Sequence, residues 1–220
     1  LGVLSLGFFY SSLWWEETVK VVALLLNVGA WPAEMCTSAR RSLAMDLSRY
    51  SSAGFERGGT RAHEWAWLLR RSFLFQHSVM PWYGLRRRVL RAFGAEVAPG
   101  VIVKPGVRIT FPWRLEIGAN SWLGEECWLL NLAPIRIGAN VCISQRAFLC
   151  TGSHDWSSPA FDLITKPIVV EDEAWICAGV FVAPGVTIGR GAVVGAGSVV
   201  TRDLPAGMIC SGNPCVAGKR

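Results

Sequence analysis

Hydrophobic residues in the last quarter of the chain recur at every sixth position, which is neither helical nor alternating spacing. The clearest run consists of aliphatic residues: Val170, Ile176, Val182, Ile188, Val194 and Val200. The positions two residues before these are also apolar or small: Ile168, Ala174, Val180, Val186, Ala192 and Ser198. Neither the period of an α-helix nor a strand's period of two explains this spacing. A period of six predicts a left-handed parallel β-helix, in which each coil consists of short strands joined by sharp turns.

The same period extends backwards through three shorter runs. These consist of Val97, Val103, Ile109 and Leu115; of Ile117, Leu123, Leu129 and Ile135; and of Ile137, Ile143 and Leu149. Each of the first two runs is displaced by two residues from the run that follows, and we expect the coil corners to absorb these displacements as bulges. The predicted solenoid therefore covers residues 96–204.

The period breaks over residues 151–167, in the stretch TGSHDWSSPAFDLITKP. This stretch is rich in turn-forming residues and contains His154, the only histidine of the repeat region. Loops that leave a regular scaffold often carry its function. The sequence therefore predicts a functional loop at 151–167, with an ordinary solvated insertion as the alternative.

Before the solenoid, we interpret residues 45–95 as a polar arm followed by basic helices. Apolar residues at helical spacing predict helices over 62–79 and 82–93, separated by Pro81 and ended at Gly94. At the other end, Leu204 and Pro205 mark the end of the solenoid, and we expect an extended C-terminal tail over 205–220.

The first 44 residues are apolar but match neither a membrane-spanning nor a secretory segment. Glu16, Glu17 and Lys20 interrupt them, and neither uncharged flank reaches the roughly 18 residues of a spanning helix. No basic residue precedes Lys20, whereas a signal peptide begins with one. We interpret residues 1–44 as an extension upstream of Met45 that is not part of the native protein; an interfacial amphipathic anchor is the alternative.

Positive charge is concentrated in one segment of the chain. The net charge is +6, and residues 46–95 contain nine arginines against three acidic residues. The core of this basic segment consists of Arg70, Arg71, Arg86, Arg87, Arg88 and Arg91, beside Trp65, Trp67 and Trp82. Such a segment could contact an anionic membrane or a lipid-linked phosphorylated glycan, or it could cap the solenoid. No nucleic-acid-binding motif accompanies it, so we expect no nucleic-acid partner.

The cysteines and histidines argue against disulfide and metal sites. Seven cysteines are an odd number without C-x-x-C spacing, which favours reduced thiols and a cytoplasmic location. A carbonic anhydrase built on such a solenoid binds zinc through three histidines, and the repeat region holds only His154. We therefore expect no metal.

Several segments resemble the hexapeptide-repeat O-acetyltransferases. They include LRAFGAEVAPGVIVKPGV, FPWRLEIGANSWLGEECWL, NLAPIRIGANVCISQ, CTGSHDW, KPIVVEDEAWI, APGVTIGRGAVVGAGSVVTRDLP and SGNP, together with DLSRYSSAGF upstream. The resemblance is greatest to the subfamily of colanic acid biosynthesis acetyltransferases. It implies transfer of an acetyl group from acetyl-CoA to a sugar hydroxyl in exopolysaccharide or surface glycan biosynthesis. It also implies a homotrimer with active sites between adjacent subunits, in the cytoplasm or peripheral to the inner face of the membrane.

This resemblance assigns the chemistry to His154, because the loop histidine of the related enzymes is the general base. A base is required since a hydroxyl must lose its proton as it attacks a thioester, and histidine titrates in the suitable range. Either Asp155 or a backbone carbonyl would hold the imidazole in the required tautomer. Trp156 is assigned to acceptor binding, and Asn131 either binds the acceptor sugar or fills a bulge.

Acetyl-CoA binding is assigned to small residues at coil corners and to cations near the C-terminus. Ala178 and Gly179 are the candidate oxyanion donors, since backbone N–H groups at a turn can face the thioester oxygen. The other assigned residues are Ala196, Gly197, Thr201, Arg202 and Lys219. Cys215 replaces an alanine that is usual in the related tail, which weakens the assignment of Lys219.

Two other functions stay open at this point. An acetyltransferase for serine or another small acceptor would share the solenoid, and a non-catalytic hexapeptide scaffold would tolerate the loss of His154. Binding of CoA distinguishes an enzyme from a scaffold, and turnover on amino acids distinguishes the two acceptor classes.

Overall fold

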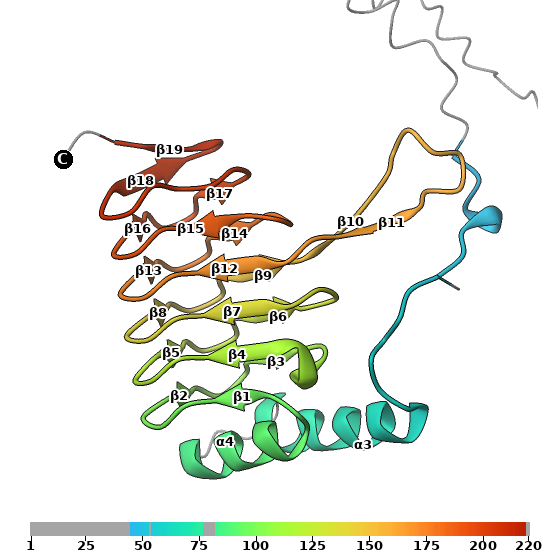
Figure 1. The fold of residues 1–220 in the computed structure, drawn as a ribbon, viewed down its shortest axis with the longest axis horizontal. Helices are drawn as coiled ribbons and strands as arrows, with labels where there is room; N and C mark the ends of the chain where they lie inside the picture. Colours follow the sequence, from blue (N-terminus) through green and yellow to red (C-terminus); the bar gives the residue numbers. More distant parts are fainter. Residues whose placement is uncertain (1–44, 53, 77–81, 219–220) are drawn as a thin grey trace, which may run out of the picture. The chain divides into compact units, whose positions relative to one another are not determined.

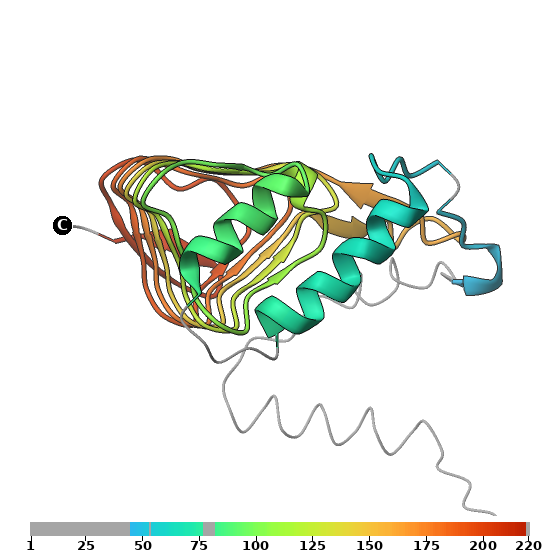
Figure 2. The same cartoon turned by 90° about the horizontal axis from the view of Figure 1, so that it is seen from below.

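The computed structural model describes residues 45–52, 54–76 and 82–218. From residue 96 onwards the chain winds into a parallel β-helix with three faces. Figure 1 shows the stack of coils from the side, and Figure 2 shows it from below, down the axis of the stack. The solenoid predicted from the period of six is thus confirmed. The interpretation of residues 1–44 concerns a segment outside the described residues.

Each face is a sheet to which successive coils contribute one strand. Face A consists of β1 (Glu96–Val97), β4 (Leu115–Ile117), β7 (Ile135–Ile137), β12 (Ile168–Val170) and β15 (Thr187–Ile188). Face B consists of β2 (Ile102–Val103), β5 (Trp122–Leu123), β8 (Cys142–Ile143), β13 (Trp175–Ile176), β16 (Val193–Val194), β18 (Ile209–Gly212) and β19 (Cys215–Ala217). Face C consists of β3 (Arg108–Ile109), β6 (Trp128–Leu130), β9 (Phe148–Cys150), β14 (Phe181–Val182) and β17 (Val199–Val200).

The interior of the coils is aliphatic. Every apolar residue that recurs at the spacing of six is buried, and most of these residues have no exposed surface. Strand β15 is typical, because Ile188 is fully buried in the core whereas Thr187 is not. Most strands of the coils contain only two or three residues, so one or two side chains per strand point inward before the chain turns to the next face. An inward residue therefore recurs about once per face, which explains the period of six. Since an unpaired charge inside such a stack is costly, polar chemistry is confined to the outer faces, the corners and the loops.

Hydrogen bonds join each coil to the coils before and after it. The N–H groups of Ile102 and Trp122 donate to carbonyl groups of the next coil, whereas the corner N–H of Asn120 donates back to Pro99 in the coil before. The first coil has no coil before it, so the carbonyl groups at its outer edge have no donors from the solenoid. These buried acceptors therefore need donors from elsewhere.

A helical cap supplies those donors. It consists of α3 (Arg61–Arg71), the π-helical turn η2 (Ser72–Gln76) and α4 (Tyr83–Ala92), which lie across the first coil in Figure 2. The carbonyl oxygen of Ile109 accepts from Trp67 Nε1 (3.1 Å) and Arg71 Nη1 (3.3 Å), that of Val103 from Arg86 Nη1 (3.2 Å), that of Val101 from Arg87 Nη1 (2.6 Å) and that of Val97 from Arg91 Nε (2.7 Å). Arginine suits this edge because it carries five N–H donors and no acceptor. Most of the basic segment thus caps the solenoid, which is one of the two alternatives that its composition left open.

The ends of the predicted elements differ from the observed ones in two places. The first predicted helix, 62–79, is an α-helix only to Arg71 and continues as a π-helical turn to Gln76, while residues 77–81 lie outside the described part. The predicted tail over 205–220 is a hairpin instead of an extended segment. Strand β18 continues face B beyond Leu204, and β19 folds back antiparallel onto it, because β18 can still pair with β16.

The irregular segments of the solenoid gather at the corner between faces C and A. Val97 lies beside Ile117, and Ile117 lies beside Ile137, so the two-residue displacements fall between these strands. They are taken up by the connections after β3, which includes the short 3-10 helix η3 (Pro112–Arg114), and after β6. The expected absorption of the displacements at a corner is confirmed, and residues 151–167 leave the solenoid at the same corner.

The capping role of the arginines can be tested by a matched pair of substitutions on α4. Arg86 is fully buried, and its Nε and Nη1 donate to the carbonyl oxygens of Leu74 and Val103. Arg86→Gln should lower the free energy of unfolding by about 2–4 kcal/mol, because buried acceptors lose charged donors. Arg88 is exposed, so Arg88→Gln should change the free energy of unfolding by less than about 0.5 kcal/mol. Urea unfolding followed by circular dichroism measures both, and equal stability of the two variants would contradict the capping role.

Candidate active site at the corner of faces C and A

The break in the hexapeptide period is an antiparallel hairpin. Its strands are β10 (Gly152–His154) and β11 (Leu163–Thr165), and His154 lies opposite Leu163. The hairpin projects from the solenoid between β9 and β12 (Figure 1). His154 therefore stands at the end of a paired strand, outside the aliphatic stack.

The imidazole of His154 is held by backbone and aromatic contacts. Its Nδ1 lies 2.8 Å from the carbonyl oxygen of Phe161, and its ring stacks on the Phe161 ring with the centroids 4.1 Å apart. Since a carbonyl oxygen can only accept, Nδ1 carries the proton and Nε2 of the neutral ring keeps its lone pair. The contact thus selects the tautomer in which Nε2 can accept a proton.

Asp155 does not make this contact. Its carboxylate accepts hydrogen bonds from the backbone N–H of Ser157 (2.8 Å) and from the Ser157 hydroxyl (2.5 Å). These bonds hold the pKa of Asp155 below its ordinary value. The sequence left two groups that could hold the tautomer of His154, Asp155 and a backbone carbonyl. The structure brings the backbone carbonyl to the imidazole, whereas Asp155 fixes the hairpin tip. Trp156 lies at this tip with 68% of its surface exposed.

An arm from the cap reaches the histidine, which sequence reasoning did not anticipate. The arm consists of residues 45–52 and 54–60 and runs along the corner to the hairpin (Figure 1). The backbone N–H of Asp46 donates to the carbonyl oxygen of Pro159 (3.0 Å), just before the 3-10 helix η1 (Leu47–Arg49). The Tyr50 ring then meets the His154 ring edge-on, with the centroids 5.6 Å apart. The only signal in the sequence was the resemblance of DLSRYSSAGF to related chains.

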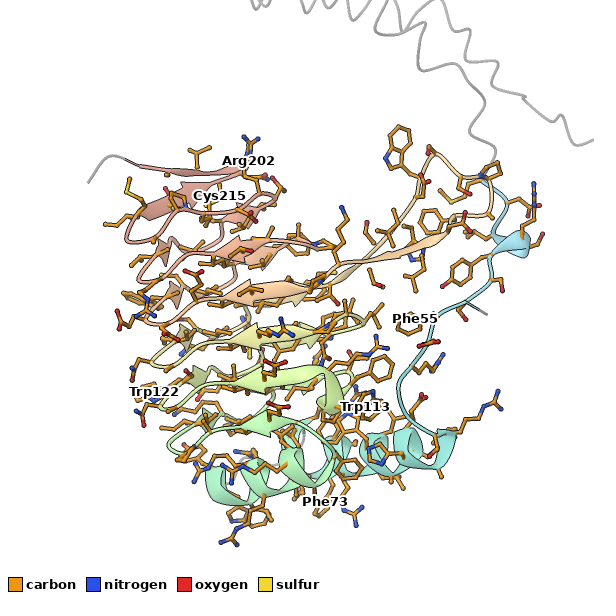
Figure 3. The ribbon with its side chains drawn as sticks, viewed as in Figure 1. Phe55, Phe73, Trp113, Trp122, Arg202 and Cys215 are labelled. Atoms are coloured by element: carbon orange, nitrogen blue, oxygen red, sulfur yellow. The ribbon has the colours of Figure 1, made fainter. Side chains whose placement is uncertain are left out.

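The lower half of the arm is anchored on the first coils. The indole of Trp113 donates to the carbonyl oxygen of Arg57 (2.7 Å), and Arg114 donates to the carbonyl oxygen of Glu56. Phe55 lies beside this anchor in Figure 3, with its ring 5.2 Å from the Arg114 guanidinium. The arm is therefore tied at both ends, which places Tyr50 at the histidine.

Asn131 does not line this site. It is fully buried, its Oδ1 accepts from the N–H groups of Thr110 and Phe111 (3.1 and 2.9 Å), and its Nδ2 donates to the carbonyl oxygen of Phe111. These bonds give partners to backbone groups of the widened connection after β3. The structure therefore replaces the acceptor-binding assignment of Asn131 with the alternative considered for it, a residue that fills a bulge.

The small residues assigned to the donor lie at a different corner. Ala178, Gly179, Ala196 and Gly197 form turns between faces B and C, where Ala178 and Gly179 line a groove with Glu125, Glu126, Gln145 and Arg146. The N–H of Gly179 donates to Gln145 and that of Gly197 to Ala178. Within the described residues the N–H of Ala178 has no partner, so of the proposed pair Ala178 is the one with a free donor.

The remaining donor residues are only partly placed. Thr201 and Arg202 are exposed and follow β17, so they lie at the same corner as the hairpin (Figure 3 labels Arg202). Lys219 lies outside the described residues. Face C separates the corner of His154 from the corner of Ala178, so a single chain does not bring the two groups together.

Cysteine and metal chemistry have no evident place in the described part of the chain. Its six cysteines are free thiols, and burial raises the pKa of Cys127 to about 12 and that of Cys150 in the same direction. A thiol with a raised pKa is a poor nucleophile. No group of three or more possible metal ligands occurs among the described residues.

A parallel β-helix with a histidine-bearing hairpin at one corner defines a hexapeptide-repeat transferase. Residues 167–202 match the family model described as bacterial transferase hexapeptide (six repeats). The chain is 44% identical over 171 residues to the Escherichia coli (strain K12) protein WcaF, described as a colanic acid biosynthesis acetyltransferase. This alignment covers 78% of the chain and 94% of WcaF. The chain therefore belongs to the hexapeptide-repeat acetyltransferases.

Solved structures of the family agree in fold. A hexapeptide-repeat containing acetyltransferase of Vibrio cholerae O1 biovar eltor, complexed with acetyl-CoA, is 29% identical with a TM-score of 0.65, over 72% of this chain and 85% of that one. A galactoside acetyltransferase in complex with coenzyme A is 25% identical with a TM-score of 0.64, over 73% of this chain and 82% of that one.

The hydrogen bonds of Asp155 predict how the hairpin tip responds to pH. Because its folded-state pKa is lowered, the carboxylate stabilises the tip above its unfolded pKa, and the contribution is lost as pH falls through the folded value. Amide exchange should show Ser157 protected at neutral pH and unprotected in acid. Asp155→Ala should remove the protection at every pH, whereas Asp162→Ala, which loses only the bond to the Ser158 hydroxyl, should keep it. Protection that is independent of both pH and Asp155 would contradict the assignment.

Proposed function

We propose that this protein transfers the acetyl group of acetyl-CoA to a hydroxyl of a sugar in the biosynthesis of a surface polysaccharide such as colanic acid. The observation that carries the proposal is the contact of His154 Nδ1 with the Phe161 carbonyl oxygen at 2.8 Å, which leaves Nε2 as the nitrogen that can accept a proton. Family membership supports the acetyltransferase reaction, two relatives of known structure bind acetyl-CoA or CoA, and the WcaF description supports the glycan.

In the proposed reaction, His154 Nε2 takes the proton of the sugar hydroxyl as its oxygen attacks the thioester carbonyl carbon. The bond between carbon and sulfur then breaks, and the imidazolium returns the proton to the CoA thiolate. The products are the O-acetyl sugar and CoA. The Phe161 carbonyl stabilises the doubly protonated ring in between, because it accepts from Nδ1–H throughout.

The negative oxygen that forms on the thioester needs a hydrogen-bond donor, and the free N–H of Ala178 suits that role. Since Ala178 and His154 lie at different corners of one chain, we assign them to one site formed by two adjacent chains of a homotrimer. Three large aromatic side chains on the outer faces support such contacts: Trp122, Trp128 and Trp175 are 51%, 37% and 49% exposed.

Acceptor and donor would enter this site from different elements. The Tyr50 ring from the arm contacts His154, and Trp156 is exposed at the hairpin tip two residues further along; such aromatic side chains suit the apolar face of a sugar ring. Small residues at Gly179, Ala196 and Gly197 permit close approach of the pantetheine arm. Arg202, with Lys219 further along, would bind the phosphates.

Substitution of His154 tests the base. His154→Ala should lower kcat by roughly 100- to 10,000-fold while leaving the KM for acetyl-CoA and the melting temperature nearly unchanged, since the residue contributes chemistry rather than packing. Ser153→Ala is the matched control, because this exposed neighbour lies on the same strand. Thiol release from acetyl-CoA in the presence of sugars, nucleotide sugars and lipid-linked oligosaccharides provides the readout. Activity of His154→Ala within a few-fold of the parent would remove His154 from the mechanism, and turnover only on serine would replace the sugar as acceptor.

The shared site is tested by complementation between two inactive variants. Ala178→Trp should block the donor groove without harming the fold, because Ala178 is exposed. His154→Ala and Ala178→Trp chains that carry different tags are co-expressed and purified through both tags. Every mixed trimer then has one site with an intact histidine and an intact neighbouring corner, so about a third of the parental activity should return.

Two controls make this result decisive. Mixed assemblies of two differently tagged His154→Ala chains should stay inactive. An inactive mixture of His154→Ala and Ala178→Trp, or a monomeric mass in light scattering, would contradict the shared site.

A further inference from the structure

The cap presents an apolar stripe on the side that faces away from the solenoid. Trp65, Leu69 and Phe73 follow one another at helical spacing and are 67%, 71% and 73% exposed. On the opposite side of the same helix, Trp67 and Arg71 bind the carbonyl of Ile109. Figure 3 shows Phe73 pointing away from the coils at the end of the molecule.

The second helix of the cap extends this surface. Trp82 and Leu85, at the start of α4, are 42% and 41% exposed, and Leu68 of α3 is 39% exposed. Single exposed apolar residues are common on soluble proteins, but six within α3, η2 and the start of α4 are a group of the kind that marks an interaction site. We call Trp65, Leu68, Leu69, Phe73, Trp82 and Leu85 the outer cap surface.

The charges that accompany the outer cap surface have one sign. Arg86, Arg87 and Arg91 are turned inward to the first coil. Arg70 and Arg88 are exposed instead, and neither has a hydrogen bond or ion pair within the described residues. The one acidic residue of α3 and α4, Glu64, is largely covered and pairs with Arg57 at 3.1 Å. The outer cap surface is therefore apolar and cationic, without exposed acidic groups of its own helices.

This combination matches the interface of a bilayer that contains anionic lipids. Tryptophan rings and aliphatic side chains lie at the boundary of headgroups and acyl chains, while arginine keeps its charge among the lipid phosphates. Each arginine near the surface strengthens binding to the bilayer through its attraction to the anionic headgroups. A bilayer also accepts a convex helical surface without needing a complementary cavity. No described helix is long and apolar enough to cross a membrane.

We propose that the outer cap surface docks this protein on anionic lipid bilayers. The coils then stand away from the lipid, and the hairpin that carries His154 lies beside the solenoid instead of between the solenoid and the membrane. In the trimer proposed above, three caps at the same end of three parallel solenoids would bind one bilayer together, which multiplies a weak single contact. The docking itself does not depend on the catalytic assignment, because none of the surface residues belongs to the proposed active site.

The test is sedimentation of the full 220-residue chain with vesicles of phosphatidylcholine, with and without phosphatidylglycerol, at low and high salt. The parent should bind the anionic vesicles, less so as salt rises. Leu69→Glu with Phe73→Glu should lower the partition coefficient by roughly tenfold or more, because both side chains leave the interface. Arg70→Gln with Arg88→Gln should lower it by about 25-fold on anionic vesicles only, about fivefold for each arginine.

The matched control is Val216→Glu, which changes an apolar residue of similar exposure (55%) in β19, at the opposite end of the solenoid. It should bind vesicles like the parent, and all variants should retain acetyl transfer to a small soluble acceptor. Failure of the parent to sediment with anionic vesicles would overturn the proposal. So would parental binding by the Leu69→Glu, Phe73→Glu variant, which would place the contact in another segment such as residues 1–44. A lower mass of that variant in sedimentation velocity, together with no vesicle binding by the parent, would identify a second copy of the chain as the occupant instead.

Discussion

The open outer edge of the first coil is the constraint on which the rest of the structure depends. Each coil bonds to the coils before and after it, but the first coil has none before it, so the carbonyl groups at its outer edge have no donors from the solenoid. Unpaired backbone groups are costly when buried, and a bare strand edge invites pairing with another chain. The guanidinium groups of Arg86, Arg87 and Arg91 close this edge. Positive charge in this protein is therefore first a requirement of its fold.

The cap in turn decides how the corner of faces C and A is built. The arm begins where α3 begins, is tied to the first coils by Trp113 and Arg114, and ends at the hairpin. Tyr50 meets His154 only because both ends of this arm are fixed. The element that satisfies the first coil thus also supplies one wall of the candidate active site.

An aliphatic interior leaves only corners and loops for chemistry, and the two corners differ in what they offer. The corner of faces C and A accommodates long connections, which can carry a projecting histidine. The corner of faces B and C has tight turns with small residues, where a backbone N–H such as that of Ala178 is open to a ligand. These properties lie on opposite edges of face C, and the homotrimer proposed above would combine them.

The sequence by itself determined the solenoid and the position of its histidine. A residue that points inward at each turn must be apolar, so the period of six is visible without any knowledge of contacts, and a loop that leaves the stack must break it. The same reasoning found the corner displacements before Ile117 and Ile137. It also restricted the excess positive charge to the segment that became the cap.

Only the tertiary structure decided what each polar side chain binds. Asp155 is the nearest carboxylate to His154 in sequence, but the imidazole bonds to Phe161, which the hairpin brings back from seven residues away. Asn131 bonds to the coil before its own, and Tyr50 reaches the histidine from about a hundred residues upstream. Hydrophobic burial depends on the type of residue and repeats along the chain, whereas a hydrogen bond depends on which partner the fold places within about 3 Å. The first can therefore be inferred from the order of residues, and the second follows only once the coils, the cap and the arm are in place.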